Sequence, residues 1–140
     1  MKNIEVVAAI IIKDEKILAV QKGKAKFDYM SYKWEFPGGK VEPSESLEQA
    51  IQREILEELS LHIIPKERLV TVNHSYPDFH IIMHCFICAV AAGEIQLIEH
   101  INLRWLDPKD LPTLDWAEAD KPVLISIAKK DNICTHGPGL

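Results

Sequence analysis

The chain has 140 residues, of which 47% are hydrophobic and 26% charged, and its formal net charge at pH 7 is −5. This length and composition are those of one soluble globular domain with a sizeable buried core. The negative charge argues against a surface that coats nucleic acid, but it permits a phosphorylated substrate that is held through a bridging cation.

Compartment signals in the sequence are few. No apolar run reaches the roughly 18 residues that a membrane span needs, and the first residues, MKNIEVV, lack the basic and then apolar layout of a signal peptide. The three cysteines, Cys85, Cys88 and Cys134, are an odd number, which favours reduced thiols over a disulfide framework. We therefore expect a cytoplasmic protein without membrane attachment, and the sequence implies no obligate protein partner.

The first part of the chain predicts a β-hairpin, a loop and a short strand. Residues 4–12, IEVVAAIII, are an apolar and β-branched run, as expected of a strand buried on both faces. Residues 16–22, KILAVQK, follow a two-residue turn and form the hairpin partner. An aperiodic loop covers 23–33, and a short strand over 34–36 stops at Pro37.

The remainder predicts a helix, three strands and a last helix. The first helix begins near Ser44 or Ser46, where the sequence supplies a cap and an acidic first turn, and it ends near Leu59. Next come strands over 70–76, 80–90 and 101–107, a turn over 107–112, and a helix over 117–130 with Pro122 in its first turn. This order predicts an α/β layered domain with a mixed sheet. We place the single domain at 1–131 and expect a flexible tail over 132–140.

The first predicted helix carries acidic side chains beside its apolar stripe. On a helical wheel the stripe runs through Ile51 and Ile55. Glu54 and Glu58 lie at its edge or inside it and Glu57 lies nearby, and these are not the positions of a solvated face. At spacings of three and four residues such charges repel by roughly 0.2–0.5 kcal/mol a pair, and the last two also oppose the helix dipole. A hard divalent cation removes these costs, whereas a purely acidic surface helix does not. The helix therefore predicts a metal site for Mg²⁺ or Mn²⁺.

The spacing of these residues resembles the Nudix box. Gly39 is followed after five residues by Glu45 and after seven more by REILEELSL (53–61), which matches that motif except at its final glycine, where the chain has Ser60. The segments WEFPGGKVE, SYPDFHI and WLDPKDLP also resemble the MutT-type nucleoside triphosphate pyrophosphohydrolases of the Nudix family. The resemblance covers most of the chain and implies an α/β/α sandwich with a mixed sheet and two main helices.

The resemblance also implies a reaction, the metal-assisted attack of water on a phosphoanhydride, in which a nucleoside triphosphate becomes a monophosphate and pyrophosphate. Carried over by position, Glu54, Glu57 and Glu58 would bind Mg²⁺ or Mn²⁺ together with the backbone carbonyl of Gly38. Arg53 would orient a catalytic carboxylate.

Further residues are assigned by their positions in the same family. Glu45 would fix the loop or the helix, Gly39 is a structural residue of the motif, and Lys40 is placed to meet a phosphate. The family uses another loop carboxylate as a metal ligand or base, for which Glu99 is our match and Glu94 is the rival.

Base recognition is expected at the start of the last helix, where the family has a base-reading side chain and this chain has Asp120. An ionised Asp only accepts hydrogen bonds, which suits a base edge rich in donors, such as that of cytosine or of a purine with N1–H and amino groups. Tyr76, Phe79 and Trp116 are candidates for stacking on the base, with core packing as the alternative for each. Lys22 is a further candidate pocket residue.

Two other features qualify the resemblance. Ser60 stands where a glycine would supply a left-handed residue after the helix, at a cost on the order of 1 kcal/mol. We expect the loop to tolerate this and catalysis to be intact, because no metal ligand is lost. The histidines at 74, 80, 84 and 100 have no spacing that implies catalysis and are expected at strand or loop surfaces.

The sequence therefore favours a Mg²⁺-dependent nucleoside triphosphate pyrophosphohydrolase that removes unwanted nucleotides before they damage DNA. The first candidate substrate is 8-oxo-dGTP, and CTP or 5-methyl-dCTP is the second. The alternative from a different class is a nucleotide-binding sensor without turnover, which the complete set of carboxylates argues against. The expected partner is a small nucleotide, and no nucleic-acid polymer is expected.

Overall fold

The computed structural model describes residues 2–130 and 133–134. Its strands are β1 (Lys2–Lys13), β2 (Lys16–Lys22), β3 (Trp34–Glu35), β4 (Gly38–Lys40), β5 (His62–Ser75), β6 (Phe79–Ala92) and β7 (His100–Leu106). They form one sheet with the order β3–β2–β1–β6–β5, to which β4 adds beside β1 and β7 beside β2. β1 and β6 run parallel and the other named pairs are antiparallel, so the sheet is mixed.

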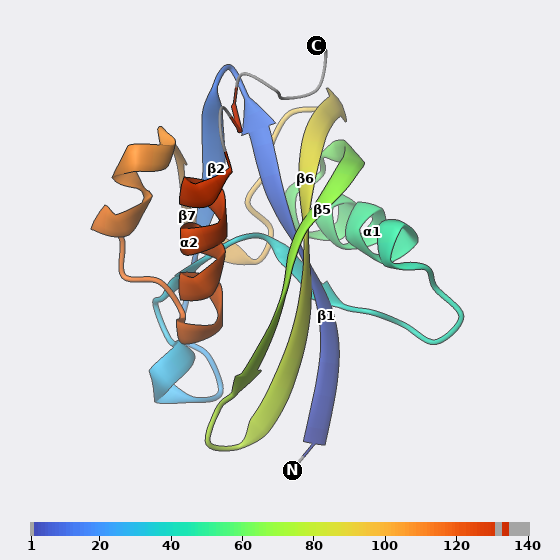
Figure 1. Ribbon diagram of the computed structural model, residues 1–140. Coiled ribbons are helices and arrows are strands. Elements are labelled where there is room, and N and C mark those ends of the chain that lie inside the picture. The colour runs from blue at the N-terminus through green and yellow to red at the C-terminus, as the bar shows by residue number, and fades with distance from the viewer. Residues whose placement is uncertain (1, 131–132, 135–140) are drawn as a thin grey trace.

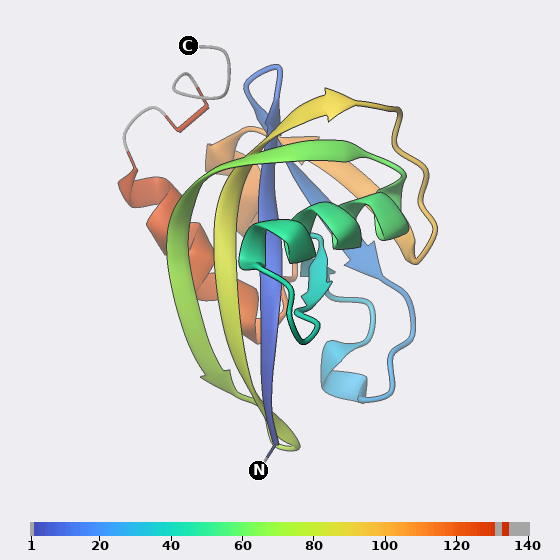
Figure 2. The ribbon, with the colours of Figure 1, turned by 90° about the vertical axis from the view of Figure 1, so that its right-hand side faces the viewer.

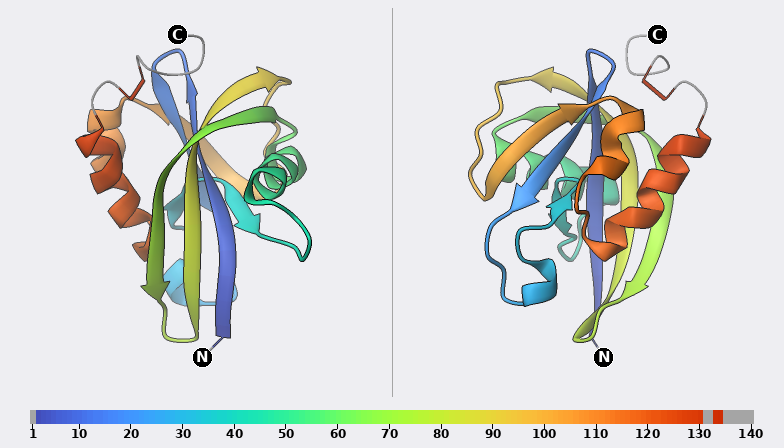
Figure 3. Two further views of the ribbon diagram at one scale, coloured as in Figure 1. Left: turned by 45° about the vertical axis from the view of Figure 1, so that its right-hand side comes forward. Right: turned by 90° about the vertical axis from the view of Figure 1, so that its left-hand side faces the viewer.

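The helical elements are α1 (Leu47–Leu59), α2 (Lys121–Lys129) and the short 3₁₀ segments η1 (Asp28–Met30), η2 (Pro108–Thr113) and η3 (Glu118–Asp120). The sheet lies between α1 on one face and α2 on the other (Figures 1 and 3). Figure 2 looks onto α1, which lies across the strands. The predicted α/β/α sandwich with a mixed sheet and two main helices is confirmed. No helix in the described part of the chain is long and apolar enough to cross a membrane.

β1 has a hydrophobic core on each face. Residues 7–12 are buried, and they alternate between a cluster on the α1 side and a cluster on the α2 side. This arrangement is what a strand in a sheet covered on both faces requires. The prediction of a strand buried on both faces is therefore confirmed for its second half, whereas residues 2–6 are exposed or half-buried.

Local sequence signals explain how the hairpin and the first helix form. β1 and β2 are joined by Asp14 and Glu15, both with positive φ, as a two-residue hairpin turn requires. At the start of α1 the Ser46 hydroxyl accepts from the Gln49 N–H at 3.0 Å, and the Gln49 side chain accepts from the Ser46 N–H at 2.9 Å. This capping box decides between the two predicted starts in favour of Ser46.

The predicted strands agree with the structure within two residues, except that β5 is much longer than its predicted range. The sequence indicates a strand over 70–76, but β5 begins at His62. The earlier part contains Pro65, which cannot donate a ladder hydrogen bond. Because β5 is an edge strand that pairs only with β6, it tolerates the proline, and its pairing register shifts between Pro65 and Glu67.

The last helix begins later than predicted. The sequence predicts it over 117–130, whereas the structure has η3 first and α2 only from Lys121, with Pro122 in the first turn as expected. The backbone before it is used elsewhere, because Trp116 forms a bridge with Trp34 and the Ala117 N–H donates to the Trp34 carbonyl at 2.9 Å. Of the predicted tail, only 133–134 are described, and Ile133 is buried in the cluster on the α2 side.

The two glycines after Pro37 form a strand that the sequence pattern does not predict. Gly38 and Gly39 belong to β4 and pair with Ala8 and Val7 of β1. A Cβ at Gly38 would lie 1.9 Å from the Val7 carbonyl oxygen, so only glycine allows this approach. The chain thus needs glycine at position 38 so that β4, which precedes the loop to α1, can pair with β1.

Ser60 ends α1 in the left-handed conformation that the family motif reserves for glycine. Its φ is 55° and its ψ is 33°, and its N–H donates to the Leu56 carbonyl at 3.0 Å. The adjacent chain at Gly93 is so close that a Cβ there would lie 2.9 Å from the Ser60 carbonyl oxygen. Ser60 therefore adopts the left-handed cap geometry, at the conformational cost that a residue other than glycine has there.

Replacing Ser60 by glycine should stabilise the domain. Ser60→Gly is expected to raise the free energy of unfolding by about 1 kcal/mol, because glycine adopts positive φ without the Cβ penalty. Urea denaturation measures this, and Gln52→Gly, inside α1, should lower stability by about 1 kcal/mol as the control. Unchanged or reduced stability of Ser60→Gly would show that residue 60 carries no strain.

Candidate active site

A cavity of about 1190 Å³ brings most of the predicted site residues together. Its wall is formed by α1, β4, the end of β2 with the following loop, the turn between β5 and β6, and η3. The predicted residues that line it are Lys22, Gly38, Gly39, Lys40, Arg53, Glu54, Glu57, Glu58, Phe79, Glu99 and Asp120. Glu45 and Ser60 do not line it, which agrees with the supporting positions predicted for them.

Glu58 is the most buried carboxylate of α1, with 5% of its surface exposed. Burial raises its pKa to about 9, and the negative charges of Glu35, Glu99 and Glu54 contribute to the rise. Within the described part of the chain, its buried Oε1 has no hydrogen-bond partner. A carboxylate in this state lacks a compensating positive charge.

The other two carboxylates differ in exposure. The side chain of Glu54 is 16% exposed, and burial raises its pKa despite the neighbouring Arg53 guanidinium. The side chain of Glu57 is 58% exposed, so the prediction that it lies away from solvent is wrong. Glu57 nevertheless lines the cavity.

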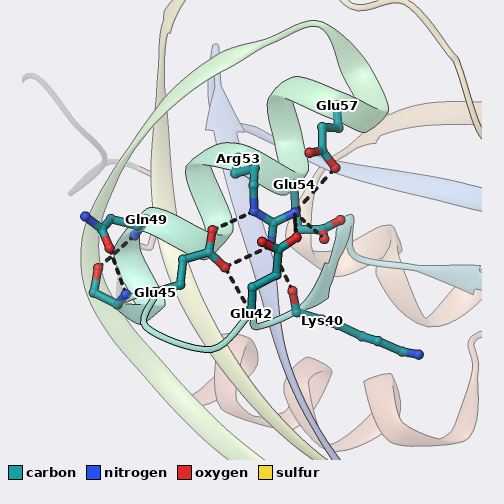
Figure 4. Close-up of polar contacts among 8 residues, drawn as sticks. Lys40, Glu42, Glu45, Gln49, Arg53, Glu54 and Glu57 are labelled. Carbon is teal, nitrogen blue, oxygen red and sulfur yellow. Dashed lines mark hydrogen bonds and ion pairs between the residues drawn. The ribbon is translucent and has the colours of Figure 1, made fainter.

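Arg53 is the centre of an ion-pair network on α1 (Figure 4). Its NH1 donates to Glu54 at 2.9 Å and to Glu57 at 3.4 Å, and its NH2 donates to the Lys40 carbonyl at 3.0 Å. Nε and NH2 also hold both oxygens of Glu45, at 2.5 and 2.9 Å. The guanidinium thus orients two of the predicted metal carboxylates and ties them to β4.

Glu45 fixes the loop that precedes α1. The Arg53 guanidinium lowers the pKa of Glu45 to about 2, and Glu45 also accepts from the Glu42 N–H at 3.0 Å. Its bonds reach both the loop and the helix, so the geometry fits the role predicted for it. Glu42 itself lies 3.6 Å from Arg53 and is mostly exposed.

Gly39 brings β4 directly against a carboxylate. A Cβ at this position would lie 2.2 Å from Oε2 of Glu54. At the neighbouring residue, the Gly38 backbone opposes the rise in the pKa of Glu58. The two glycines of the motif therefore place backbone, without side chains, beside two carboxylates of α1.

The residues at this end of the cavity fit a divalent cation. The donors are carboxylate oxygens, which hard cations prefer, and the partnerless Oε1 of Glu58 is an oxygen that a cation would satisfy. Among residues 2–130 and 133–134, no three acidic, His or Cys side chains stand close enough to form a ready-made metal cluster. The reason is Arg53, which draws Glu54 and Glu57 toward itself, so these carboxylates would turn from the guanidinium to bind a cation.

Glu99, the predicted loop carboxylate, lines the cavity, and its charge raises the pKa of both Glu54 and Glu58. Glu94, its rival, is exposed and does not line the cavity. The geometry therefore favours Glu99 as the additional carboxylate.

Asp120 lies at the other end of the cavity and is 5% exposed. Its Oδ2 accepts from the Phe36 N–H at 2.9 Å. Burial and the charge of Glu35 raise its pKa well above the usual value, against the opposing effects of the Phe36 N–H and Lys22. The expectation of an acceptor-only Asp is not supported, because the raised pKa favours the protonated form, which also donates.

The stacking candidates separate into two groups. Tyr76 and Phe79 line the cavity, whereas Trp116 is 2% exposed, does not line it and packs on Phe36 in the core. The core alternative therefore holds for Trp116. Phe27, an aromatic residue that the sequence reasoning missed, also lines the cavity, and Tyr29, likewise missed, stacks on it without lining the cavity.

Stacked aromatic rings connect two segments that are distant in sequence, the loop around η1 and the turn between β5 and β6. The rings of Phe27 and Tyr29 are stacked at 5.2 Å, and Tyr29 is stacked on Tyr76 at 5.4 Å. The Tyr29 hydroxyl donates to Asp78 at 2.8 Å. No periodicity marks Phe27 and Tyr29, because they lie in the loop around η1, and only their aromatic character could have drawn attention to them.

His100 and Glu35 are further residues that the sequence reasoning missed. The prediction that His100 lies at the surface is wrong, because it is 8% exposed and its Nε2 lies 2.9 Å from Oε2 of Glu35. Both residues line the cavity. The other three histidines, at 74, 80 and 84, are partly exposed on strands, as expected.

A family model described as "NUDIX domain" matches residues 2–126, nearly the whole described chain. The chain belongs to the Nudix family. This confirms the resemblance seen in the sequence, and with it the prediction of a hydrolase. Enzymes of the family use divalent cations and act on small nucleotides, in agreement with the carboxylate end of the cavity.

Individual Nudix proteins are also similar to the chain. The CTP pyrophosphohydrolase of Escherichia coli is 40% identical over 89% of this chain and 90% of its own length. The 8-oxo-dGTP diphosphatase of Proteus vulgaris is 35% identical over 67% of this chain and 83% of its own. The solution structure of the E. coli ORF135 protein has a TM-score of 0.78 and 39% identity, covering 91% of this chain and 90% of that one.

Alanine at Gly38 and at Gly39 should have different consequences, one for stability and the other for cation binding. Gly38→Ala is expected to lower the free energy of unfolding by about 3 kcal/mol, because its Cβ meets the backbone of β1. Gly39→Ala should fold, since the Glu54 side chain can turn away, but it should weaken divalent-cation binding by at least about tenfold. Urea denaturation and calorimetric Mn²⁺ titration measure the two effects. Strong cation binding by folded Gly39→Ala would show that Glu54 does not need this space.

The buried charge of Glu58 should make the cation-free domain sensitive to pH. Its folded pKa is about 9 and its ordinary value 4.5, so the folded state binds the extra proton between these values. With EDTA present, wild-type stability should therefore fall relative to Glu58→Gln as pH rises from 4.5 to 9. At pH 8, Glu58→Gln should be more stable by roughly 1–3 kcal/mol. Glu48→Gln, at an exposed site on the same helix, is the control, and parallel pH profiles for wild type and Glu58→Gln would contradict this view.

Proposed function

We propose that this Nudix protein is a Mg²⁺-dependent nucleoside triphosphate pyrophosphohydrolase that releases a monophosphate and pyrophosphate. The observation that carries the proposal is the buried, partnerless Glu58 oxygen beside Glu54 and Glu99, at one end of a cavity whose other end has aromatic side chains. A triphosphate with its cations suits the first end, and a base suits the second. The relatives named CTP pyrophosphohydrolase and 8-oxo-dGTP diphosphatase support the same reaction.

The roles of the chain's residues follow from their places in the cavity. Glu54, Glu57 and Glu58, with the Gly38 carbonyl, would hold Mg²⁺ or Mn²⁺, which supplies neutralisation of phosphate charge and a more acidic water. Arg53 orients Glu54 and Glu57 through the hydrogen bonds described above.

The remaining roles belong to residues around the phosphates and the attacking water. Glu99 would add a ligand or take the proton of the attacking water. Lys40 is exposed at the rim of the cavity, where its ammonium can meet the outer phosphates. Lys22 lies nearer the base end, since its charge acts on the pKa of Asp120.

A cytosine nucleotide, CTP or 5-methyl-dCTP, is the substrate that we now place first, ahead of 8-oxo-dGTP. Of the two named nucleotide hydrolases, the CTP pyrophosphohydrolase has the higher identity to this chain, 40% against 35%, and covers more of it, 89% against 67%. Chemistry at the base end agrees, because a protonated Asp120 donates to a ring nitrogen while Glu35 accepts from an exocyclic amine. The relative named 8-oxo-dGTP diphosphatase keeps 8-oxo-dGTP as the second candidate.

The non-catalytic sensor has less support. A sensor needs a nucleotide pocket but does not need several carboxylates held at the cost of burying one of them. Here all three motif carboxylates are present, and Arg53 and Glu45 form an ordered network behind them.

The test is hydrolysis by the purified protein with Mg²⁺. We expect pyrophosphate release and the highest kcat/KM for CTP or 5-methyl-dCTP in a panel that also contains 8-oxo-dGTP, dGTP, dATP and ADP-ribose. Glu57→Gln and Glu58→Gln should each lower kcat by at least about 100-fold with the fold retained. Glu48→Gln is the matched control and should behave as wild type.

Each outcome has a separate meaning. No pyrophosphate from any nucleotide would refute the enzyme and leave the sensor. A preference for 8-oxo-dGTP would reverse only the order of substrates. Near-normal kcat for Glu57→Gln and Glu58→Gln would show that the cation is held elsewhere.

A further inference from the structure

His100 is a buried histidine whose role the proposed reaction does not explain. It is the first residue of β7 and follows Glu99 directly, and its side chain is 4% exposed. Its Nε2 lies 2.9 Å from Oε2 of Glu35, and because a carboxylate oxygen accepts, Nε2 donates. Its Nδ1 is buried and has no hydrogen-bond partner among the residues that the structure describes. A polar ring buried for a single hydrogen bond needs a reason.

The strand geometry directs this ring across β2. The β2–β7 pairing is regular up to Gln21 and Asn102, and then its register shifts so that Lys22 lies opposite His100. Irregularities of this kind re-aim side chains, and they are common next to active sites. The imidazole thereby reaches Glu35 on β3, which pairs with β2. One hydrogen bond connects the two strands that flank the end of β2.

Glu99 lies between two residues, Ile98 and His100, that each form a hydrogen bond to another segment. Residues 93–99 contain no helix or strand. On one side of Glu99, the Ile98 N–H donates to the Glu58 carbonyl at 3.2 Å. On the other side stands the hydrogen bond of His100. Glu99 is exposed and lines the cavity, and its charge contributes to the raised pKa of Glu54 and Glu58, so it lies within electrostatic reach of both.

We propose that His100 is a positioning residue, which holds the Glu99 carboxylate beside Glu54 and Glu58 through its hydrogen bond to Glu35. The inference rests on the proposed function, since it gives His100 a task in that reaction. The His100–Glu35 hydrogen bond also links the two ends of the cavity. Glu35 binds His100, and the next residue, Phe36, donates its N–H to Asp120, so the backbone at 35–36 sets the distance between the carboxylates and the base end.

Two variants of similar size separate the hydrogen bond from packing. His100→Leu fills the space without a donor, and His100→Gln places an amide donor where Nε2 stood. His100→Leu should lower kcat by about tenfold, change KM less than about threefold, and weaken Mn²⁺ binding in calorimetry by about tenfold. His100→Gln should recover most of both. His84→Ala is the matched control, because His84 also faces a glutamate, Glu5 at 3.6 Å, but does not line the cavity.

A double-mutant cycle with Glu99→Gln tests whether His100 acts through Glu99. Because a positioning residue has no effect once the group that it positions is gone, His100→Leu should change kcat less than twofold in the Glu99→Gln background. A general structural defect would instead lower kcat by the same factor in both backgrounds. If His100→Leu does not fold, His100→Asn, whose shorter amide falls short of Glu35, replaces it under the same criteria.

The outcomes separate this inference from the proposed function. An inactive wild-type protein would refute the proposed function. Mn²⁺ binding by the variants would still test whether the His100–Glu35 hydrogen bond positions Glu99. An active wild type with normal kcat and normal Mn²⁺ binding in His100→Leu would overturn the inference alone. So would additive effects in the cycle, equal losses in His100→Leu and His100→Gln, or a Glu99→Gln variant with wild-type kcat.

Discussion

Helix α1 buries the carboxylate of Glu58 through the same packing that stabilises the domain, and the rest of the site depends on this constraint. Ile51, Ile55 and Leu59 are fully buried against the sheet, and Glu58 lies in the same interface. The core therefore desolvates the carboxylate, and the neighbouring acids add to its cost. A cation that binds there would meet a carboxylate oxygen, Oε1 of Glu58, that has no hydrogen-bond partner among the described residues.

Arg53 explains how the domain holds its acidic helix together. Its guanidinium contacts Glu45, Glu54 and Glu57, so the network offsets the repulsion among these charges. Glu58 is outside its reach and remains uncompensated. The acidic side chains of the helix therefore differ, because Arg53 orients Glu54 and Glu57 whereas Glu58 is buried without a cationic partner among the described residues.

The base end of the cavity is connected to this helix through a very short piece of chain. β3 and β4 are separated by only two residues. Over 35–39 the chain supplies the acceptor for His100 on Glu35, the N–H donor for Asp120 on Phe36, and Gly39, which lies against Glu54. A displacement of this segment would move both ends together. Such coupling suits a substrate whose base and phosphates must be placed at once.

The sequence by itself determined the family, the layered fold and the position of the acidic helix, because these depend on periodic and closely spaced signals. The apolar run in β1, the cap near Ser44 or Ser46 and the glutamates at three- and four-residue spacings are all local. Where strand pairing overrode the local pattern, the sequence misplaced elements, as with the early start of β5 on a sheet edge and the late start of α2 after the Trp34–Trp116 bridge.

Only the tertiary structure decided which side chains of separate segments meet. Glu35 and His100 are 65 residues apart, and Tyr29 and Asp78 are 49 apart, so no spacing could have connected them. The exposure of Glu57 and the raised pKa of Asp120 were likewise beyond sequence reasoning. Burial and local charge depend on the elements that pack around a group, and these come from the whole fold.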